Sequence, residues 1–293
     1  MIIKYTSHHK NKSIELNSYK PPYVLQEREG LNGLSADIKT FRGVAQTGVS
    51  VQASLIRERL VTIKGAIVYD SYEEKEKLKQ NIYSVFNPAF TGDIKIITDA
   101  NTEFNLKNIY IEEAPVFEEL LNGPDIEFFT VSFTCPEPFL LSKEKKVSLQ
   151  NEEGTWIFDW DILKEGVTLS TINSNAIENA YNAGDIETPV KIVIRARGHM
   201  IDPYVINLTK NEAIYINCTL KANERIEITT GYGNKKVYHF DKDNNKTDIF
   251  KYIDLNTSFF SLNVGDNLIK YGSKRSVENM SVDIYYNDRF LGV

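Results

Sequence analysis

Short runs of strand-forming residues, separated by turns, recur along almost the whole chain, and this pattern limits the fold more than any other feature. Apolar and polar residues alternate clearly in 49–55 (VSVQASL) and in 60–65 (LVTIKG). Such alternation predicts strands of a sheet that has one buried face. The 16 Tyr and 15 Phe residues also favour strands. We therefore expect a mainly β protein.

One segment departs from this pattern and predicts a helix. Ser71, followed three residues later by Glu74, forms a capping box. An apolar stripe follows at helical spacing and is expected to pack into the core, while the opposite, charged face is expected to be solvated. The stripe consists of Leu78, Ile82, Val85 and Phe86. The helix is predicted to end at Asn87 and Pro88, because the residue before a proline avoids the α region.

The length of 293 residues predicts two domains, since one hydrophobic core usually stops growing below this size. Further strands are predicted in the first part at 2–5, 13–17, 23–28, 36–41, 48–57, 59–69, 93–98, 104–112 and 126–134. Pro136 and Pro138 interrupt them, and the lysine-rich run 142–146 follows. We place the boundary near residue 140, which gives domains 1–140 and 141–293.

The second domain is also predicted to be rich in short strands. These are expected at 155–160, 176–181, 190–195, 204–207, 213–217, 225–230, 235–240, 259–262, 267–271 and 281–286. Short strands at this spacing, with turns between them, are typical of a β-sandwich or jelly roll.

Charge, hydropathy and cysteine usage argue against nucleic-acid binding, membrane insertion and a structural metal. The net charge of −6 predicts no nucleic-acid partner that binds through a broad basic surface. No apolar run is long enough to span a membrane and no signal-peptide core is present, so we expect synthesis in the cytoplasm and no membrane insertion. Cys135 and Cys218 are isolated, which predicts reduced thiols, no structural zinc and no cofactor.

Histidine and acidic clusters offer few candidate ligands. His8 and His9 are adjacent, and adjacent side chains of an extended chain point to opposite sides, so a solvated pair is favoured over a metal site. His199 and His239 are isolated. Segment 241–252 begins like a calcium loop, with Asp241, Asp243 and Asn245 at alternate positions, but a lysine stands where that loop needs glycine. A polar hairpin tip is favoured there, as is a hairpin turn at 231–233 (GYG).

Two tryptophans raise the question of sugar chemistry. Trp156 and Trp160 share one face of a predicted strand, and Asp159 and Asp161 share the other. Paired carboxylates could serve a glycosidase, and exposed rings could stack on a sugar. Core tryptophans with acids at the rim explain the pattern equally well. We predict no catalytic, cofactor-binding or metal-binding residues, and a second domain that does not usefully bind simple sugars.

Several turn-rich motifs follow one another in a fixed order over most of the chain. They are GLNGL at 30–34 with ADI at 36–38, LVTIKG at 60–65, FTCPEPF at 133–139, NAGDIETPVKI at 182–192 and SFFSLNVGDN at 258–267. In order and spacing they resemble the distal tail protein family of long-tailed (siphovirus-type) bacteriophages, the phage tail component family. The stretch 146–174 departs from the family pattern.

The resemblance implies both a fold and a role. The first domain would be a split β-barrel with one α-helix, and the second a galectin-like β-sandwich. The chain would be a structural hub of a phage or prophage-derived tail tip, forming a ring of usually six copies. Its partners would be the tail tube protein, the tail tip protein or tail-associated lysin, and receptor-binding or baseplate proteins.

Two further points follow from this interpretation. The strands between 48 and 69 are too regular to be left as bare edges, so we expect neighbouring barrels to form the ring through them. The alternative function is a carbohydrate-binding module that attaches the particle to the host cell wall. A glycoside hydrolase, the third class, is not required by any feature of the sequence.

Overall fold

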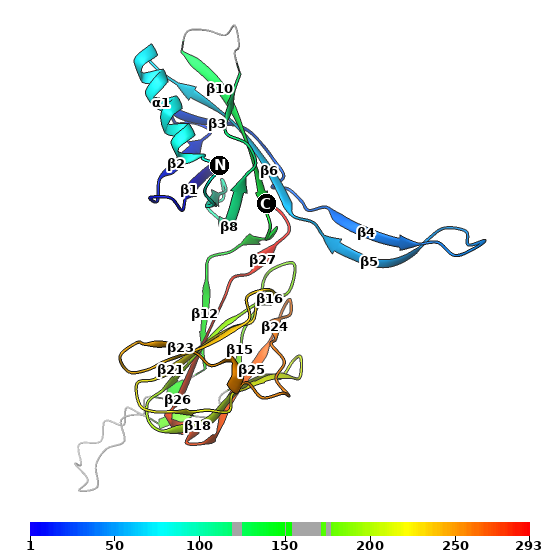
Figure 1. Ribbon diagram of the computed structural model, residues 1–293, viewed down its shortest axis with the longest axis vertical. Coiled ribbons are helices and arrows are strands. Elements are labelled where there is room, and N and C mark those ends of the chain that lie inside the picture. Colours follow the sequence, from blue (N-terminus) through cyan, green and yellow to red (C-terminus); the bar gives the residue numbers. More distant parts are fainter. Residues whose placement is uncertain (119–124, 150, 154–170, 174–176) are drawn as a thin grey trace. The chain divides into compact units, whose positions relative to one another are not determined.

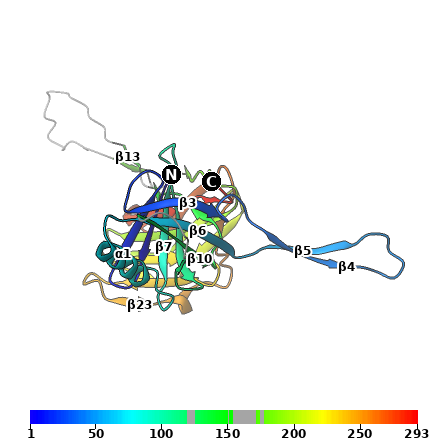
Figure 2. The ribbon, with the colours of Figure 1, turned by 90° about the horizontal axis from the view of Figure 1, so that it is seen from above.

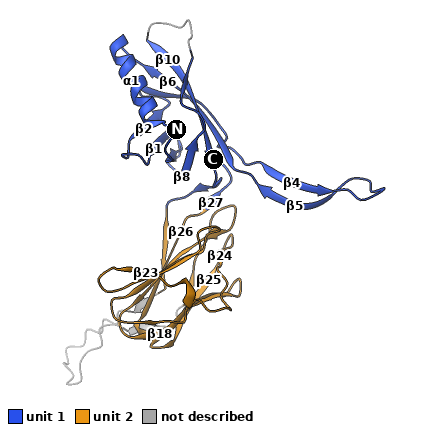
Figure 3. Ribbon diagram, viewed as in Figure 1, with its two compact units in different colours: residues 1–143, 289–293 blue, residues 144–288 orange. Residues whose placement is uncertain are grey.

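The computed structural model describes residues 1–118, 125–149, 151–153, 171–173 and 177–293. The chain divides into two compact units (Figure 3). Unit 1 consists of Met1–Lys143 and Arg289–Val293, and unit 2 of Glu144–Asp288. Both are built mainly from strands (Figure 1), which confirms the predicted mainly β fold class.

Unit 1 is a closed barrel of seven strands. Its order is β8-β7-β1-β2-β3-β6-β10, and β10 closes the barrel by pairing with β8. Neighbouring strands are antiparallel except β2 and β3, which meet in parallel at Asn17 and Val24. The barrel strands are β1 (Ile2–Ser7), β2 (Ser13–Asn17), β3 (Tyr23–Glu29), β6 (Arg59–Val68), β7 (Gly92–Ile97), β8 (Glu103–Ile111) and β10 (Ile126–Cys135).

Three short strands extend this sheet beyond the barrel. β9 (Val116–Phe117) pairs with β10, and β11 (Leu140–Leu141) pairs with β8. β27 (Arg289–Phe290), which lies near the other end of the sequence, pairs with β11. The last five residues of the chain are therefore part of unit 1.

Helix α1 (Tyr72–Val85) forms as its sequence predicts. The Ser71 side chain accepts a hydrogen bond from the Glu74 amide at 3.2 Å, and Ile82 and Val85 are buried. The opposite face is less solvated than expected. Lys75 and Lys79 both pair with the Glu127 carboxylate of β10, at 3.1 and 3.0 Å.

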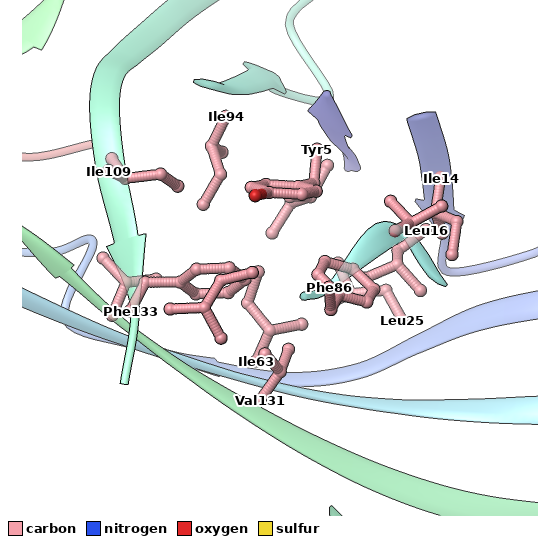
Figure 4. Close-up of a cluster of buried hydrophobic side chains, with 14 of the residues drawn as sticks. Tyr5, Ile14, Leu16, Leu25, Ile63, Phe86, Ile94, Ile109, Val131 and Phe133 are labelled. Carbon is pink, nitrogen blue, oxygen red and sulfur yellow. The ribbon is translucent and has the colours of Figure 1, made fainter. Parts of the chain in front are cut away.

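The core of unit 1 lies inside the barrel, with α1 contributing at one side (Figure 4). β6 alternates as predicted, since Val61 and Ile63 are buried while Leu60 is exposed. Phe86, just after α1, packs with its ring centroid 4.9 Å from that of Tyr5 and 5.9 Å from that of Phe133. Aromatic contacts of this kind add to the stability that area burial gives.

Strand β6 is not an edge, because it pairs with β3 on one side and β10 on the other. The exposed strands are instead β4 (Ala36–Phe41) and β5 (Ser50–Ile56), which pair with each other as a separate two-stranded sheet. The prediction of one buried face for 49–55 is wrong: almost every residue of β5 is exposed. In the structure no second layer covers the described residues of this hairpin. The alternating apolar residues of β5 therefore have no core to pack into.

Unit 2 is a β-sandwich in which two sheets share one hydrophobic core. The strands of the first sheet, in spatial order, are β12 (Lys145–Ser148), β26 (Met280–Tyr286), β17 (Lys191–Ala196), β21 (Arg225–Thr229), β22 (Lys236–Phe240) and β23 (Lys246–Asp248). Those of the second are β15 (Ile177–Asn179), β25 (Leu268–Arg275), β18 (Met200–Asn207) and β19 (Glu212–Tyr215), with β20 (Thr219–Leu220) also on β18.

Short elements complete the described part of unit 2. They are the paired strands β13 (Asn151–Glu153) and β14 (Thr171–Asn173), the paired strands β16 (Thr188–Pro189) and β24 (Ser261–Leu262), and the 3₁₀ helices η1 (Phe250–Tyr252) and η2 (Val277–Asn279). The lysine-rich run 142–146, next to which the domain boundary was predicted, contains the start of β12. The predicted strand 155–160 lies outside the described residues.

The family motifs of unit 2 organise turns. Asn267 is fully buried, and its side chain binds the amide and the carbonyl of Asn263 at 2.9 and 2.8 Å. Gly265 in the same turn has φ +89°, which favours glycine. Asn182 closes the other motif by donating to the Ile186 carbonyl at 3.0 Å. In this chain these residues hold the turns of the two motifs.

A charged network covers part of the first sheet of unit 2. The Asp283 carboxylate accepts from Ser148 at 2.6 Å, pairs with Lys146 at 3.1 Å, and pairs with Arg195. Burial alone would raise the pKa of Asp283, but these donors outweigh it and hold the pKa below its ordinary value. The network therefore favours the ionised carboxylate.

Candidate functional site

The residues that sequence analysis weighed as ligands do not form a shared site. His8 lies 2.9 Å from the Thr91 hydroxyl and 3.1 Å from Asp93, whereas the His9 ring stacks on Phe90 with centroids 4.1 Å apart. The two histidines thus contact different partners. The described residues contain no group of three or more His, Cys, Asp or Glu side chains that could hold a metal ion.

The calcium-like segment is a hairpin tip between β22 and β23, as the sequence favoured. The Asp241 carboxylate is occupied by the amides of Asp243 and Asn245, each at 2.9 Å, and by the Asn245 side chain at 2.8 Å. The GYG segment is likewise a turn, with the Asn234 amide donating to the Gly231 carbonyl. Trp156, Trp160, Asp159 and Asp161 lie outside the described residues, so sugar binding through them stays a prediction.

The cysteines are free thiols in the structure. Burial raises the pKa of both Cys135 and Cys218 to about 12. A thiolate is the reactive form, so neither side chain is poised for nucleophilic chemistry. Within the described residues, no helix is long and apolar enough to cross a membrane.

The strongest candidate for a partner-binding surface in unit 1 is the β4–β5 hairpin, here called the arm (36–56). Figures 1 and 2 show it projecting away from the barrel in both views. Each of its strands pairs only with the other in the described structure, so each has one open edge. Open edges and a lone two-stranded ribbon are unfavourable in isolation.

Apolar side chains cover the arm without being buried. Val51 is 63 % exposed, Leu55 54 % and Val44, in the connecting loop, fully exposed. The other exposed apolar residues of the arm are Ile38, Phe41, Val49 and Ile56. Single exposed apolar residues are common, but seven on one hairpin are a concentration that favours a protein contact.

The tip of the arm is ordered by one polar side chain. Gln46 accepts from the Gly43 amide at 2.8 Å through its side-chain oxygen and donates to the Ser50 hydroxyl at 2.9 Å. Its backbone carbonyl accepts from the Arg42 guanidinium at 3.2 Å. The loop between the two strands is therefore a defined turn.

The root of the arm is fixed by a buried arginine. Arg59, the first residue of β6, is only 1 % exposed, and its guanidinium donates to four backbone carbonyls. The acceptors are Pro138 at 2.6 Å, Gly30 at 2.5 Å, Leu291 at 2.8 Å and Gly33 at 3.4 Å. Burial lowers the pKa of this guanidinium, but four carbonyls replace the lost water.

Close packing around Arg59 depends on glycine. Gly30 has φ +80°, and a Cβ there would lie 1.8 Å from the Leu60 carbonyl oxygen. A hollow of the arm root is lined by Gly30, Gly33, Leu34, Ser35, Arg57, Glu58, Arg59 and Leu60. The sequence marked the two glycines of GLNGL as a loop, but nothing in it joins that loop to Arg59 or to residue 291. Only the barrel brings these segments together.

Comparison with known proteins agrees with this architecture. Residues 10–135 match the model of the phage tail protein RIFT-related domain, and residues 183–290 match that of the siphovirus-type tail component, C-terminal domain. No curated protein sequence matches the chain.

Several solved structures share the fold. SPP1 Dit, described as a paradigm of the hub adsorption apparatus in phages that infect Gram-positive bacteria, is 10% identical with a TM-score of 0.67, over 99% of both chains. A chain of the phage P2 baseplate in its activated conformation with Ca is 9% identical with a TM-score of 0.56, over 100% of both chains. With both domain models matched in order and the fold shared along its length, the chain belongs to the distal tail protein family of siphovirus-type phage tails.

Proposed function

We propose that this structural protein of the phage tail-tip hub forms a closed ring of six copies. Unit 1 forms the ring, and unit 2 is the galectin-like domain. The ring joins the tail tube protein to the tail tip or lysin protein and to receptor-binding or baseplate proteins. The chain is made in the bacterial cytoplasm, acts at the virion tail tip, and catalyses no reaction.

The exposed arm is the observation that carries this proposal. Its apolar side chains remain in contact with water in the single chain, although burial of one Val or Leu side chain contributes about 1.5–3 kcal/mol. Several such residues on each of six arms would stabilise a ring substantially. A partner is therefore expected to cover the arm once the protein assembles.

The geometry of the arm favours a second copy of this chain as that partner. An arm that leaves the barrel and docks on a different surface of the next copy makes a head-to-tail contact. Such contacts generate a ring whenever the rotation between copies closes. Of the strands between 48 and 69 that were expected to form the contact, β6 is already paired on both sides, whereas β5 lies in the arm and has an open edge.

The test compares the full chain with an armless variant. The Arg57 amide donates to the Ser35 carbonyl at 3.0 Å, so residues 36–56 can be replaced by a short glycine turn without stretching the root. The control shortens the exposed β22–β23 tip of unit 2 at 242–244. Oligomeric state is measured by sedimentation and by native mass spectrometry over a wide range of concentration.

Each outcome decides one part of the proposal. We expect the full chain and the control to form rings at high concentration and the armless variant to stay monomeric. Rings of the armless variant would show that another surface makes the contact. A full chain that stays monomeric at every concentration, and also when mixed with purified tail tube protein, would refute the ring itself.

A further inference from the structure

The segment Arg289–Val293, here called the return segment, meets the root of the arm at Arg59. The chain leaves unit 1 at Lys143 and re-enters it at Arg289. The Leu291 carbonyl of this segment accepts from Arg59 at 2.8 Å, across a separation of 232 residues. One guanidinium thus holds the return segment and the GLNGL loop at the same time.

Both strands of the arm leave the barrel beside this guanidinium. β4 begins three residues after Gly33, and β5 ends three residues before Arg59. The bond from the Arg57 amide to the Ser35 carbonyl is the last rung before the arm separates from the barrel. The two strands of the arm are attached to the barrel only through these residues. Their backbone geometry therefore sets the direction in which the arm projects.

The return segment is packed firmly against the same loop. The Val293 amide donates to the Leu31 carbonyl at 3.2 Å. A Cβ on Gly292 would lie 2.7 Å from the Asn32 carbonyl oxygen, so the two backbones are in close contact. Farther back, the Phe290 ring meets Phe104 edge to face, with centroids 5.4 Å apart.

We propose that the return segment is a positioning element for the arm. When seated, it holds the GLNGL loop and Arg59 in one geometry, and the arm projects in one direction. When it is displaced, Arg59 loses an acceptor, the loop loses its packing, and the arm samples a wider range of directions. Contact between copies then weakens. This inference rests on the proposed function for its link to the ring.

The return segment is covalently continuous with unit 2, and this connection could let unit 2 influence the arm. Asp288, the last residue of unit 2, is joined to Arg289 by a single peptide bond. A partner that binds unit 2 and pulls on its last strand would therefore act on the return segment without an intervening linker. Binding at unit 2 and presentation of the arm would be coupled in this way.

The test wedges the return segment away from the loop with one methyl group. Gly292→Ala places a Cβ against the Asn32 carbonyl, whereas Gly33→Ala adds the same group to the same loop where no atom lies within 4 Å. Spin labels at Val44→Cys and Lys107→Cys report the distance from arm to barrel. Cys218→Ser removes the half-buried thiol, and the fully buried Cys135 stays unlabelled.

Measurements on dilute single chains keep the result independent of ring formation. We expect Gly292→Ala to broaden the distance distribution and to speed exchange of the Arg57 amide about tenfold, the effect of losing one or two hydrogen bonds. Gly33→Ala should match the parent in both. Circular dichroism checks that the barrel is folded, and Phe290→Ala provides a second way of loosening the segment if Gly292→Ala unfolds it.

Either of two results would overturn the inference. One is a folded Gly292→Ala or Phe290→Ala protein whose arm distances and Arg57 exchange equal those of the parent. The other is an equal broadening by Gly33→Ala, which would show that any change in the loop suffices. A parent chain that never forms rings would instead refute the proposed function and leave the arm measurement unaffected.

Discussion

Replacing Arg59 with methionine should destabilise unit 1 far more than the same change at Arg57, two residues earlier. Each hydrogen bond from a charged donor contributes about 1.5–3 kcal/mol. Three of the Arg59 bonds are short, at 2.5 to 2.8 Å, and the fourth is long at 3.4 Å. The desolvation cost recovered on removing the guanidinium offsets part of this, which leaves a net loss of about 3–5 kcal/mol.

Arg57 is the matched control because its side chain is 56% exposed and pairs with the half-exposed Asp37, at 3.1 Å. Such a surface pair contributes about 0–1 kcal/mol. Urea unfolding followed by hydrogen exchange separates the two units, with unit 2 as the internal reference. At about 2 kcal/mol per M, the Arg59→Met midpoint for unit 1 should fall by about 2 M. Equal midpoints for the two variants would refute the role given to the buried guanidinium.

Four further outcomes follow from features of the fold. Gly65→Ala should destabilise the barrel by about 1–3 kcal/mol, because its Cβ would lie 2.6 Å from the Phe129 ring. Asp283→Asn should lower the melting temperature of unit 2 at pH 7; the depressed pKa means that this stabilisation is present above the ordinary value of 3.8 and is lost as pH falls below it. Cys135 and Cys218 should react slowly with a thiol reagent at pH 8 until the protein unfolds, and a metal chelator should leave the melting temperature unchanged.

Each of these outcomes has its own control. Gly231→Ala adds the same methyl group where the nearest atoms are 3.8 Å away and should change little. The stability difference between parent and Asp283→Asn proteins should shrink as pH falls below the ordinary pKa of 3.8, and a constant difference at every pH would contradict the linkage argument. Rapid labelling of the folded protein would show that the cysteines are accessible, and a large drop in melting temperature with chelator would reveal a metal site.

Local chemistry explains why much of the fold could be predicted. The capping box at Ser71 and the apolar stripe that ends at Phe86 need only neighbours within two turns, and α1 follows them closely. β6 could be predicted because buried residues alternate with less buried ones along its first half. The same reasoning failed for β5, whose alternation is equally regular. Alternation shows that a strand could bury one face, but only tertiary structure decides whether anything lies there.

The arm root could not be predicted for a different reason. Arg59 is a charged residue in a charged stretch, next to exposed neighbours, and its sequence environment favours a surface position. Its acceptors are the backbone carbonyls of Pro138, Gly30 and Leu291. Every residue has a backbone carbonyl, so the sequence does not indicate which of them accept this bond. The glycines of GLNGL were visible as a loop, yet their need to approach Leu60 closely depends on barrel closure.

The division of the chain also has a consequence for its synthesis. Unit 1 begins at Met1 but is finished only by residues 289–293, after all of unit 2 has been made. A polypeptide that stops before residue 289 leaves Arg59 without its Leu291 acceptor and β11 without β27. Prematurely terminated products thus carry a defect in the very unit proposed to enter the ring.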